Sequence, residues 1–246
     1  MRKELLVIIP ARSESTRVKN KNMRKLNGKP LIYYKIKECL KIKGITVLVS
    51  TDCKKIALFA KNNGAYVPFL RNKKYATSKS STTAVILETL RQMKKRNLDI
   101  PNFIGILPPT NPFLKSSSIL KAYKKIKRSK KVNSILTFTK SSDHPFNVIN
   151  MQKKMKFDVL KINNKKYSQF ERTQDWPKVF ISSPALKISK KNYFLKMIKN
   201  ISPLNQNKTF DINSCTGKQI SKIESFDINN LEDFQLADYF AKKNLL

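Results

Sequence analysis

The chain has 246 residues, of which 40% are hydrophobic and 27% charged, an ordinary balance for one large globular α/β domain. Its formal net charge of +35 is not ordinary, and a basic excess of this size is typical of proteins with an anionic partner such as nucleic acid, a membrane surface or nucleotide phosphates. The lysines are spread along the whole chain among Asn and Ile residues, with no basic tail and no arginine-rich arm, so a general bias towards these residue types explains the charge better than a dedicated basic patch.

Four short apolar segments predict strands that are buried on both faces of a sheet. They are residues 5–9, 47–49, 103–107 and 134–138, and unbroken runs of this kind are typical of parallel sheets. Between them, apolar residues recur at the spacing of helices that bury one face. The three helical sets are Ile32, Ile36, Cys39 and Leu40; Ile86, Leu90 and Met93; and Ile119, Tyr123 and Ile126. Strands that alternate with helices predict an α/β fold with a mostly parallel sheet flanked by helices.

The alternation stops after about Ser141. Residues 145–187 hold two short strand-like pieces, a polar stretch rich in Lys and Asn, and then Gln174-Asp175-Trp176-Pro177, with no strong helical pattern. We interpret residues 1–246 as a single domain with an insertion at about 145–180, which would be a cap or an arm for dimerisation. A last helix follows, in which one face is formed by Leu231, Phe234, Ala237, Phe240 and Ala241.

The cysteines and the single histidine argue against two kinds of site. Cys39, Cys53 and Cys215 stand far apart, with no Cys-x-x-Cys spacing and no cluster with His144, so we expect neither a disulfide framework nor a zinc site. The first residues lack the anatomy of a signal peptide, and no apolar stretch reaches the ~20 residues that cross a bilayer. We therefore expect a cytoplasmic protein without a membrane partner.

The most informative segment follows the first predicted strand. Ligands of parallel α/β sheets bind outside the carboxyl ends of the strands, and this loop, residues 10–22, reads Pro-Ala-Arg-Ser-Glu-Ser-Thr-Arg-Val-Lys-Asn-Lys-Asn. Arg offers forked donors, Lys offers a point charge, and backbone N–H groups can form an anion-binding concavity. The loop therefore suits a polyphosphate, although it is not a Walker motif. A solvated basic loop is the alternative.

This loop, together with the Gly-Lys-Pro-Leu of residues 28–31, resembles the signature of the acylneuraminate cytidylyltransferases. Five further blocks resemble that family in the same order and at compatible spacing. They are residues 49–52 with 56–57; 64–65 with 68–71 and 76–77; 107–112; 144–145 with 174–175; and 227–229 with 232–234. The resemblance implies a Rossmann-like nucleotidyltransferase that transfers CMP from CTP to an acidic nonulosonic sugar of the sialic, legionaminic or pseudaminic type. It also implies a homodimer that is built partly by the insertion.

The resemblance assigns roles to individual residues. Arg12, Ser15 and Lys21 would hold the triphosphate, with Asn22 and Arg71 beside the nucleotide, and the remaining nucleotide-binding positions would be Ala11, Arg17, Thr82, Pro109 and Thr110. Arg12 and Lys21 are expected to be catalytic, together with Asp227. Mg²⁺ would be met by Asp227 and, by position, Asn229, and the sugar by Gln174 and Ser183. A transfer of this kind needs charge neutralisation and in-line positioning more than covalent help from the protein.

Four departures from the family pattern bear on the proposed function. Thr16 stands where the family usually has a lysine, although Arg17 follows, and Glu14 places a carboxylate in a loop meant for phosphates. Ser-Pro-Ala-Leu-Lys at 183–187 replaces the Asn-Gly-Ala-Ile-Tyr segment that helps to hold the sugar, and Asn229 replaces a second aspartate. The nucleotide half of the resemblance is thus better kept than the sugar half, which leaves room for a different nine-carbon acid.

Three other functions remain open. A cytidylyltransferase for 3-deoxy-manno-octulosonate fits the Ser15-Thr16-Arg17 run, but the additional residues 19–22 favour the sialic type. A member of the family without catalytic activity fits Glu14 and Asn229. A nucleic-acid-binding protein fits the net charge, but we find no basic face with interleaved aromatics and no known motif, so no specific nucleic-acid partner is expected.

For several residues, a purely structural role is the alternative to a role in function. Asp52 could cap the next helix, Arg71 could be a surface residue, His144 is better explained as a structural or rim residue than as a base, and Asn229 could cap the last helix.

Overall fold

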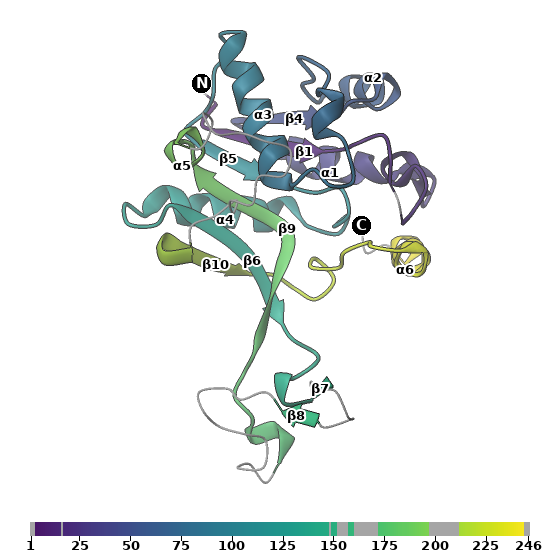
Figure 1. Ribbon diagram of the computed structural model, residues 1–246, viewed down its shortest axis with the longest axis vertical. Helices are drawn as coiled ribbons and strands as arrows, with labels where there is room; N and C mark the ends of the chain where they lie inside the picture. Colours follow the sequence, from purple (N-terminus) through teal and green to yellow (C-terminus); the bar gives the residue numbers. More distant parts are fainter. Residues whose placement is uncertain are drawn as a thin grey trace.

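The computed structural model describes residues 3–15, 17–147, 149–151, 157–159, 172–196 and 212–243. A six-stranded sheet forms the centre of the body, in the order β10–β6–β9–β5–β1–β4 (Figure 1). β1 (Leu5–Pro10) pairs in parallel with β4 (Ile45–Ser50) and β5 (Phe103–Ile106), and β6 (Ser134–Lys140) pairs in parallel with β10 (Cys215–Gln219). The four predicted strands and the mostly parallel α/β sheet are confirmed.

The strand β9 (Phe180–Lys190) was not predicted. It lies between β5 and β6 and is antiparallel to both. Its polar residues are buried in pairs, since Ser189 Oγ lies 2.9 Å from Ser134 Oγ and Thr137 Oγ1 donates to Ser183 O at 3.2 Å. Because of these polar residues, the pattern of hydrophobic residues does not predict this central strand. Their hydrogen bonds form only after strands that are distant in the sequence have paired.

Helices cover both faces of the sheet. α1 (Leu31–Leu40), α2 (Lys54–Asn62) and α4 (Ser116–Arg128) share a core with every other residue of β1, namely Leu5, Val7 and Ile9. α3 (Thr82–Lys95) and α5 (Lys191–Leu195) pack with Leu6 and Ile8 on the opposite face. This division follows from the alternation of side chains along a strand.

Two residues assigned to buried helix faces lie at helix ends and are exposed. Leu40, the last residue of α1, is 41% exposed, and Leu231, the first residue of α6 (Leu231–Lys242), is 44% exposed. Helix ends extend past the surface that they cover, so the apolar periodicity overestimated the buried stripe by one residue in each helix.

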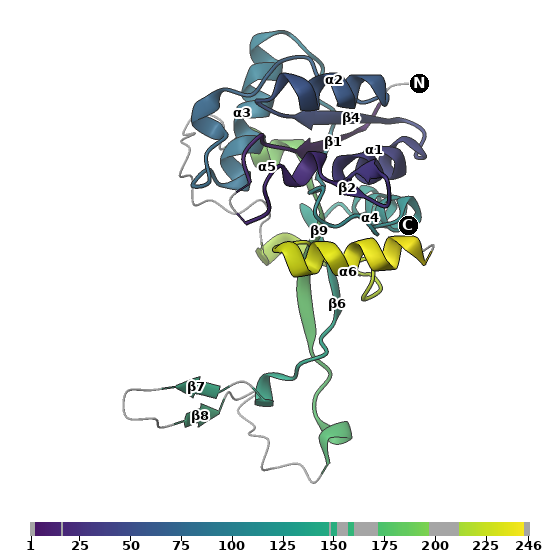
Figure 2. The ribbon, with the colours of Figure 1, turned by 90° about the vertical axis from the view of Figure 1, so that its right-hand side faces the viewer.

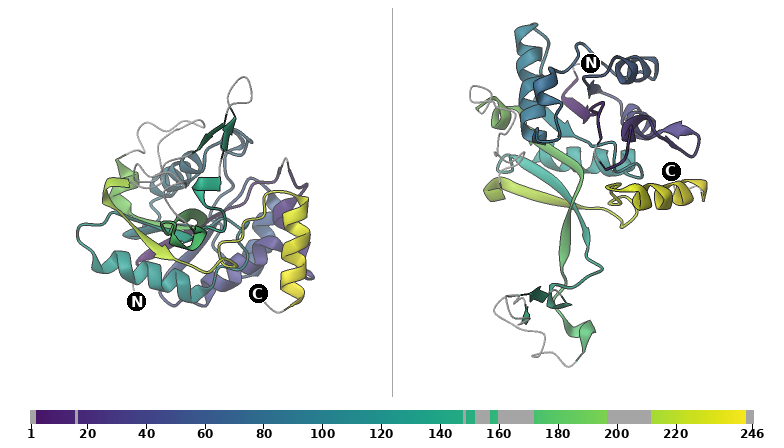
Figure 3. Two further views of the ribbon diagram at one scale, coloured as in Figure 1. Left: turned by 90° about the horizontal axis from the view of Figure 1, so that it is seen from below. Right: turned by 45° about the vertical axis from the view of Figure 1, so that its right-hand side comes forward.

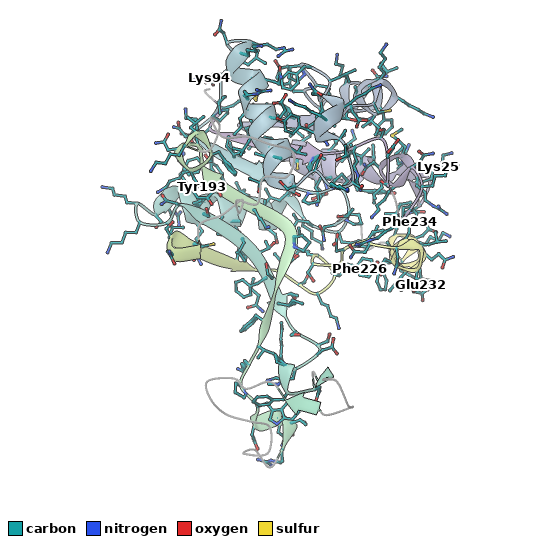
Figure 4. The ribbon with its side chains drawn as sticks, viewed as in Figure 1. Lys25, Lys94, Tyr193, Phe226, Glu232 and Phe234 are labelled. Carbon is teal, nitrogen blue, oxygen red and sulfur yellow. The ribbon has the colours of Figure 1, made fainter. Side chains whose placement is uncertain are left out.

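The C-terminal segment forms a third core against the strand-end loops. Phe234 and Ala237 of α6 pack with Leu26 of β2 (Lys25–Leu26), which pairs with β3 (Lys29–Pro30), and with Ile228. Figure 2 shows α6 beside β2 and the start of α1. Figure 4 shows Phe226 and Phe234 on this side of the body. The packing fixes the segment 225–229 next to the loops that follow β1 and β5.

β6 and β9 continue beyond the body as a projecting ribbon (Figures 1 and 3). Beyond the ribbon lie a pair of antiparallel strands, β7 (Ile149–Met151) and β8 (Phe157–Val159), and two short 3-10 helices, Pro145–Asn147 and Thr173–Asp175. The described residues of the predicted insertion, 145–180, lie at this end. Across the residues described, no helix is both long and apolar enough to cross a membrane.

Candidate active site

A cleft of about 400 Å³ opens at the carboxyl ends of β1 and β5, which is where ligands of parallel α/β sheets bind. All but one of the residues proposed for nucleotide binding line it: Arg12, Ser15, Arg17, Lys21, Asn22, Arg71, Thr82, Pro109 and Thr110. The exception is Ala11, whose methyl group is fully buried in the core beneath the loop, while its backbone N donates to Ser50 O at 2.9 Å.

The loop after β1 is held in shape by Asp52. Its carboxylate accepts from the backbone N of Ser13 at 2.9 Å and from Ser13 Oγ at 2.5 Å. Asp52 does not cap α2, because Thr51 Oγ1 accepts from the N of the capping residue Cys53. The interpretation of Asp52 as a helix cap is therefore wrong, and its carboxylate instead holds the loop after β1. Glu14 is exposed and does not line the cleft.

Arg12 spans the cleft to residues 75–85, a segment in which only Thr82 was predicted to bind the nucleotide. Its Nη1 donates to Thr77 O at 2.8 Å. The 75–85 region supplies several unpredicted lining residues, namely Tyr75, Thr77, Ser78, Ser80 and Val85. Its family-like Ala76-Thr77 pair was the available signal. The helix α3 that follows is capped by Ser81, whose side chain accepts from Ala84 N at 3.1 Å. Thr16 lies outside the described residues.

Arg71 is a buried cation that lines the cleft. It is only 6% exposed, so its interpretation as a surface residue is wrong. Its Nε donates to Ser50 Oγ at 3.2 Å, its Nη2 to Ser50 O, and its Nη1 to Tyr75 O at 3.5 Å. Burial lowers the pKa of Arg71 to about 10, against the attraction of Asp52, so the guanidinium stays charged at neutral pH.

Lys21 joins the loop after β1 to the C-terminal segment. Its Nζ donates to Ile228 O at 2.8 Å and to Asn229 O at 3.4 Å. Burial lowers the pKa of Lys21, and the charge of Asp227 opposes that shift. The loop after β5 holds the same segment, because Ile228 N donates to Thr110 O at 2.9 Å. Asp227 is thereby placed near the cationic end of the cleft.

Asn111 and Lys35 also help to hold the C-terminal segment in place, a role that was not predicted from the sequence. Asn111 Nδ2 donates to Phe226 O at 2.9 Å and to Ser225 O at 3.3 Å, while Asn111 O accepts from Lys35 Nζ at 2.6 Å. Lys35 is fully buried, and burial lowers its pKa to about 8. The sequence did contain a signal, because Lys35 falls on the apolar face of α1 between Ile32 and Cys39, where a lysine needs a buried acceptor.

Asp227 presents a buried carboxylate oxygen to its surroundings. The residue is partly buried, and its Oδ1 is buried without a hydrogen-bond partner among the residues described. An unpartnered buried carboxylate oxygen is costly unless a cation or a donor completes it. The described ranges contain no group of three or more His, Cys, Asp or Glu side chains that could hold a metal. Mg²⁺ at Asp227 would therefore depend on substrate phosphates for further ligands.

The side chain of Asn229 does not cap α6, although its backbone N donates to Asp233 Oδ2 at 2.8 Å. The capping residue of α6 is Asn230, which forms a capping box with Asp233, so the interpretation of Asn229 as the cap is wrong. Asn229 is exposed, and its Nδ2 donates to Asp227 O at 3.3 Å. Its side-chain oxygen stays available beside Asp227.

The two residues proposed for the sugar do not line the cleft. Gln174 is exposed on the 3-10 helix Thr173–Asp175 in the projection. Ser183 is 2% exposed within β9, where its Oγ accepts from Ala185 N at 3.3 Å. In the same projection, His144 is engaged on both ring nitrogens, since Nδ1 accepts from Phe146 N at 3.1 Å and Nε2 lies 2.9 Å from Pro177 O. This supports a structural role for His144.

Comparisons with known proteins agree with this geometry. A family described as "Cytidylyltransferase" matches residues 6–244. The CMP-N,N'-diacetyllegionaminic acid synthase of Legionella pneumophila is 37% identical over 116 residues, 47% of this chain and 50% of that protein. The N-acylneuraminate cytidylyltransferase of Escherichia coli O18:K1:H7 is 28% identical over 99% of this chain and 53% of that protein. The matches thus span about half the length of these curated relatives.

A solved structure extends the likeness to the fold. It is titled CMP:2-keto-3-deoxy-manno-octonic acid synthetase complexed with CTP, and it matches with a TM-score of 0.70 and 12% identity. The match covers 98% of this chain and 99% of the solved chain, so it includes the sheet and the projecting ribbon. At this level of identity the likeness concerns the fold alone.

Proposed function

This chain belongs to the cytidylyltransferase family, and we propose that it transfers CMP from CTP to an acidic nonulosonic sugar of the sialic, legionaminic or pseudaminic type, with release of pyrophosphate. The observation that carries this proposal is the lining of the cleft. It contains Arg12, Arg17, Lys21 and Arg71, and none of its described residues bears a carboxylate. A cluster of cations at the carboxyl end of a parallel sheet suits the triphosphate of a nucleotide.

The reaction needs positioning and charge neutralisation. The anomeric hydroxyl of the sugar attacks the α-phosphorus of CTP and gives up its proton to water as the new P–O bond forms. The bond between the α-phosphorus and the bridging oxygen breaks, and pyrophosphate leaves with the electron pair. The guanidinium groups of Arg12 and Arg71 and the ammonium of Lys21 face the charge that develops on the leaving oxygens. Their anchors to Thr77, Ser50 and Ile228 hold them in place before the substrate binds.

Mg²⁺ is the cofactor that we propose. Asp227 would hold the ion, with Asn229 as a weaker oxygen ligand, and the ion would neutralise and align the phosphate oxygens. The support is the unpartnered Oδ1 of Asp227 near the ammonium of Lys21. Asn lacks the charge of the aspartate that the family pattern has at this position, so this chain should need more Mg²⁺ than a relative with two carboxylates.

A homodimer is part of the same proposal. The ribbon exposes Phe180 (50%) and Ile181 (57%), which pair with Lys140 and Thr139 at the end of β6. Apolar side chains on a projecting ribbon are typical of a protein–protein contact. The sugar pocket would then be completed outside the cleft of one chain, which is consistent with the position of Gln174 in the projection.

The octulosonate analogue remains the second candidate, since Ser15 and Arg17 match that family's loop and both line the cleft. Residues 19–22 favour the nonulosonic acid.

One experiment tests the substrate class directly. The purified protein is incubated with CTP, Mg²⁺ and a panel of nonulosonic acids, octulosonic acids and neutral sugar phosphates, and pyrophosphate is measured. We expect release with an acidic α-keto sugar and none with glucose 1-phosphate. Release with glucose 1-phosphate and with no acid sugar would reject the proposal. Fastest release with the octulosonic acid would select the second candidate.

A further inference from the structure

Two buried hydroxyl groups connect Arg71 to Val85, another residue that lines the cleft. Ser50, the last residue of β4, and Thr89, within α3, are 2% and 1% exposed, and neither lines the cleft. Arg71 Nε donates to Ser50 Oγ at 3.2 Å, Ser50 Oγ lies 3.0 Å from Thr89 Oγ1, and Thr89 Oγ1 donates to Val85 O at 2.8 Å. Val85 lines the cleft, so the chain of hydrogen bonds begins and ends at residues of the cleft wall.

The direction of this series of hydrogen bonds is fixed because each hydroxyl group has only one hydrogen to donate. A hydroxyl group donates once, and Thr89 uses its hydrogen on Val85 O. Ser50 therefore donates to Thr89, and its oxygen accepts from Arg71. Hydrogen bonds that run in one direction strengthen one another. The hydroxyl of Thr89 thus determines how strongly Ser50 accepts from the guanidinium.

Arg71 depends on this support because no carboxylate is hydrogen-bonded to it, although the charge of Asp52 attracts it. In the part of the chain that the structure describes, no ion pair includes Arg71. Its bonds to Ser50 and Tyr75 use three donor positions of the guanidinium, and further N–H groups remain. A buried cation that is bonded only to neutral oxygens is arranged to receive an anion.

We propose that Ser50 and Thr89 are positioning residues, which orient the guanidinium of Arg71 towards an anionic group of the bound nucleotide. The inference rests on the proposed nucleotide site. It adds two residues that lie outside the cleft and that act on the ligand through Arg71. Thr89 is separated from the ligand by Ser50 and Arg71, so its removal affects affinity only as far as Arg71 is displaced.

The first test is Thr89→Val, which removes the hydroxyl and keeps a branched side chain of similar size. We expect the Kd for CTP, measured by calorimetry, to rise by about five- to tenfold, as the loss of one hydrogen bond between neutral groups implies. KM for CTP should rise similarly, while KM for the sugar stays unchanged. Thr89→Ser, which retains the hydroxyl, should restore the affinity. Thr46→Val, a matched change at a partly buried threonine of β4, should leave it unaltered.

A double-mutant cycle separates positioning from packing. Thr89→Val is introduced into an Arg71→Met background, where the guanidinium is absent. If Thr89 acts through Arg71, the second change adds no further loss of CTP affinity. The same loss in both backgrounds would show that Thr89 supports the packing of α3, and the inference would be overturned. Should Thr89→Val fail to fold, Ser50→Ala provides the same cycle from the other hydroxyl.

The outcome for the wild-type protein keeps the two proposals apart. A wild-type protein that binds no CTP would contradict the proposed function. A wild-type protein that binds CTP, with a Thr89→Val variant that binds it equally well, would contradict only the positioning role.

Discussion

The side chains that line the cleft and the apolar side chains of the projecting ribbon differ in how they are supported. In the cleft, Arg12, Lys21 and Arg71 are each tied to a backbone carbonyl of another segment, so a single chain pre-organises them. On the ribbon, Phe180 and Ile181 are about half exposed, and Phe180 contacts Phe138 of the neighbouring strand. The cationic residues of the cleft are therefore held in place within one chain. The apolar side chains of the ribbon, in contrast, would be stabilised by burial against another surface.

This difference has a functional consequence. A site that must neutralise a triphosphate requires fixed charges, because charges that reorganise during the reaction contribute less to catalysis. A surface that joins two chains requires exposed apolar area before assembly. Substitutions in the cleft should thus alter CTP binding and turnover without altering assembly, whereas substitutions on the ribbon should alter assembly without altering CTP binding.

The largest effect is expected from the charges of the cleft. Arg12→Ala and Lys21→Ala should each lower turnover by about 10²–10³, the usual loss for one pre-organised donor. Steady-state release of pyrophosphate measures the effect. Lys54→Ala, which removes an exposed charge of α2 outside the cleft, is the matched control and should retain full turnover. Near-normal turnover in both cleft variants would place the nucleotide elsewhere.

A second prediction concerns Mg²⁺ at the edge of the cleft. Asp227→Ala should abolish turnover, and Asn229→Asp should lower the Mg²⁺ concentration for half-maximal rate, because a second carboxylate strengthens a site for a hard cation. Asn230→Asp is the control, since Asn230 caps α6 and Asp caps equally well. A Mg²⁺ titration of the wild type and the three variants decides the matter. An identical Mg²⁺ dependence for Asn229→Asp and the wild type would exclude Asn229 from the ion.

The same contrast explains what the sequence could predict. The strands of the core and the loop at 10–22 are encoded in contiguous residues, and the structure confirms those strands and brings the loop to the cleft. Ser50, which accepts from Arg71, and Phe226, which accepts from Asn111, lie 21 and 115 positions away along the chain, so only the folded structure reveals these contacts. β10 (Cys215–Gln219) was missed for a similar reason. Its polar sequence becomes a strand through pairing with β6, and Gly217 allows the ring of Phe138 to pack closely.

A third prediction concerns the buried lysine Lys35, which donates to Asn111 O behind the cleft. Burial depresses the pKa of Lys35 to about 8, so between pH 8 and its unfolded value the unfolded chain binds more protons than the folded one. Stability should therefore rise with pH over that window and be lost as pH falls through 8. Relative to Lys35→Met, the free energy of unfolding of the wild type should increase by about 2 kcal/mol from pH 7 to pH 9.5.

Urea unfolding of both proteins at the two pH values measures this difference. Cys39, whose pKa burial raises to about 12, is present in both, so its contribution largely cancels. Lys37→Met removes an exposed lysine from the same helix and should show no such dependence. A pH-independent difference between the wild type and Lys35→Met would indicate that Lys35 is not desolvated in solution.

The smallest effect on the cleft is expected from the ribbon. Phe180→Ser combined with Ile181→Ser should leave the Kd for CTP within about twofold, because no residue of the ribbon lines the cleft and half-exposed side chains contribute little to the fold of one chain. On the proposed dimer, sedimentation should instead report a mass of two chains for the wild type and one chain for the variant. Leu58→Ser, at a residue that is 62% exposed on α2, is the control and should keep the wild-type mass. A variant that keeps its mass but loses CTP binding would reverse the assignment of the two regions, since the ribbon would then support the cleft rather than assembly.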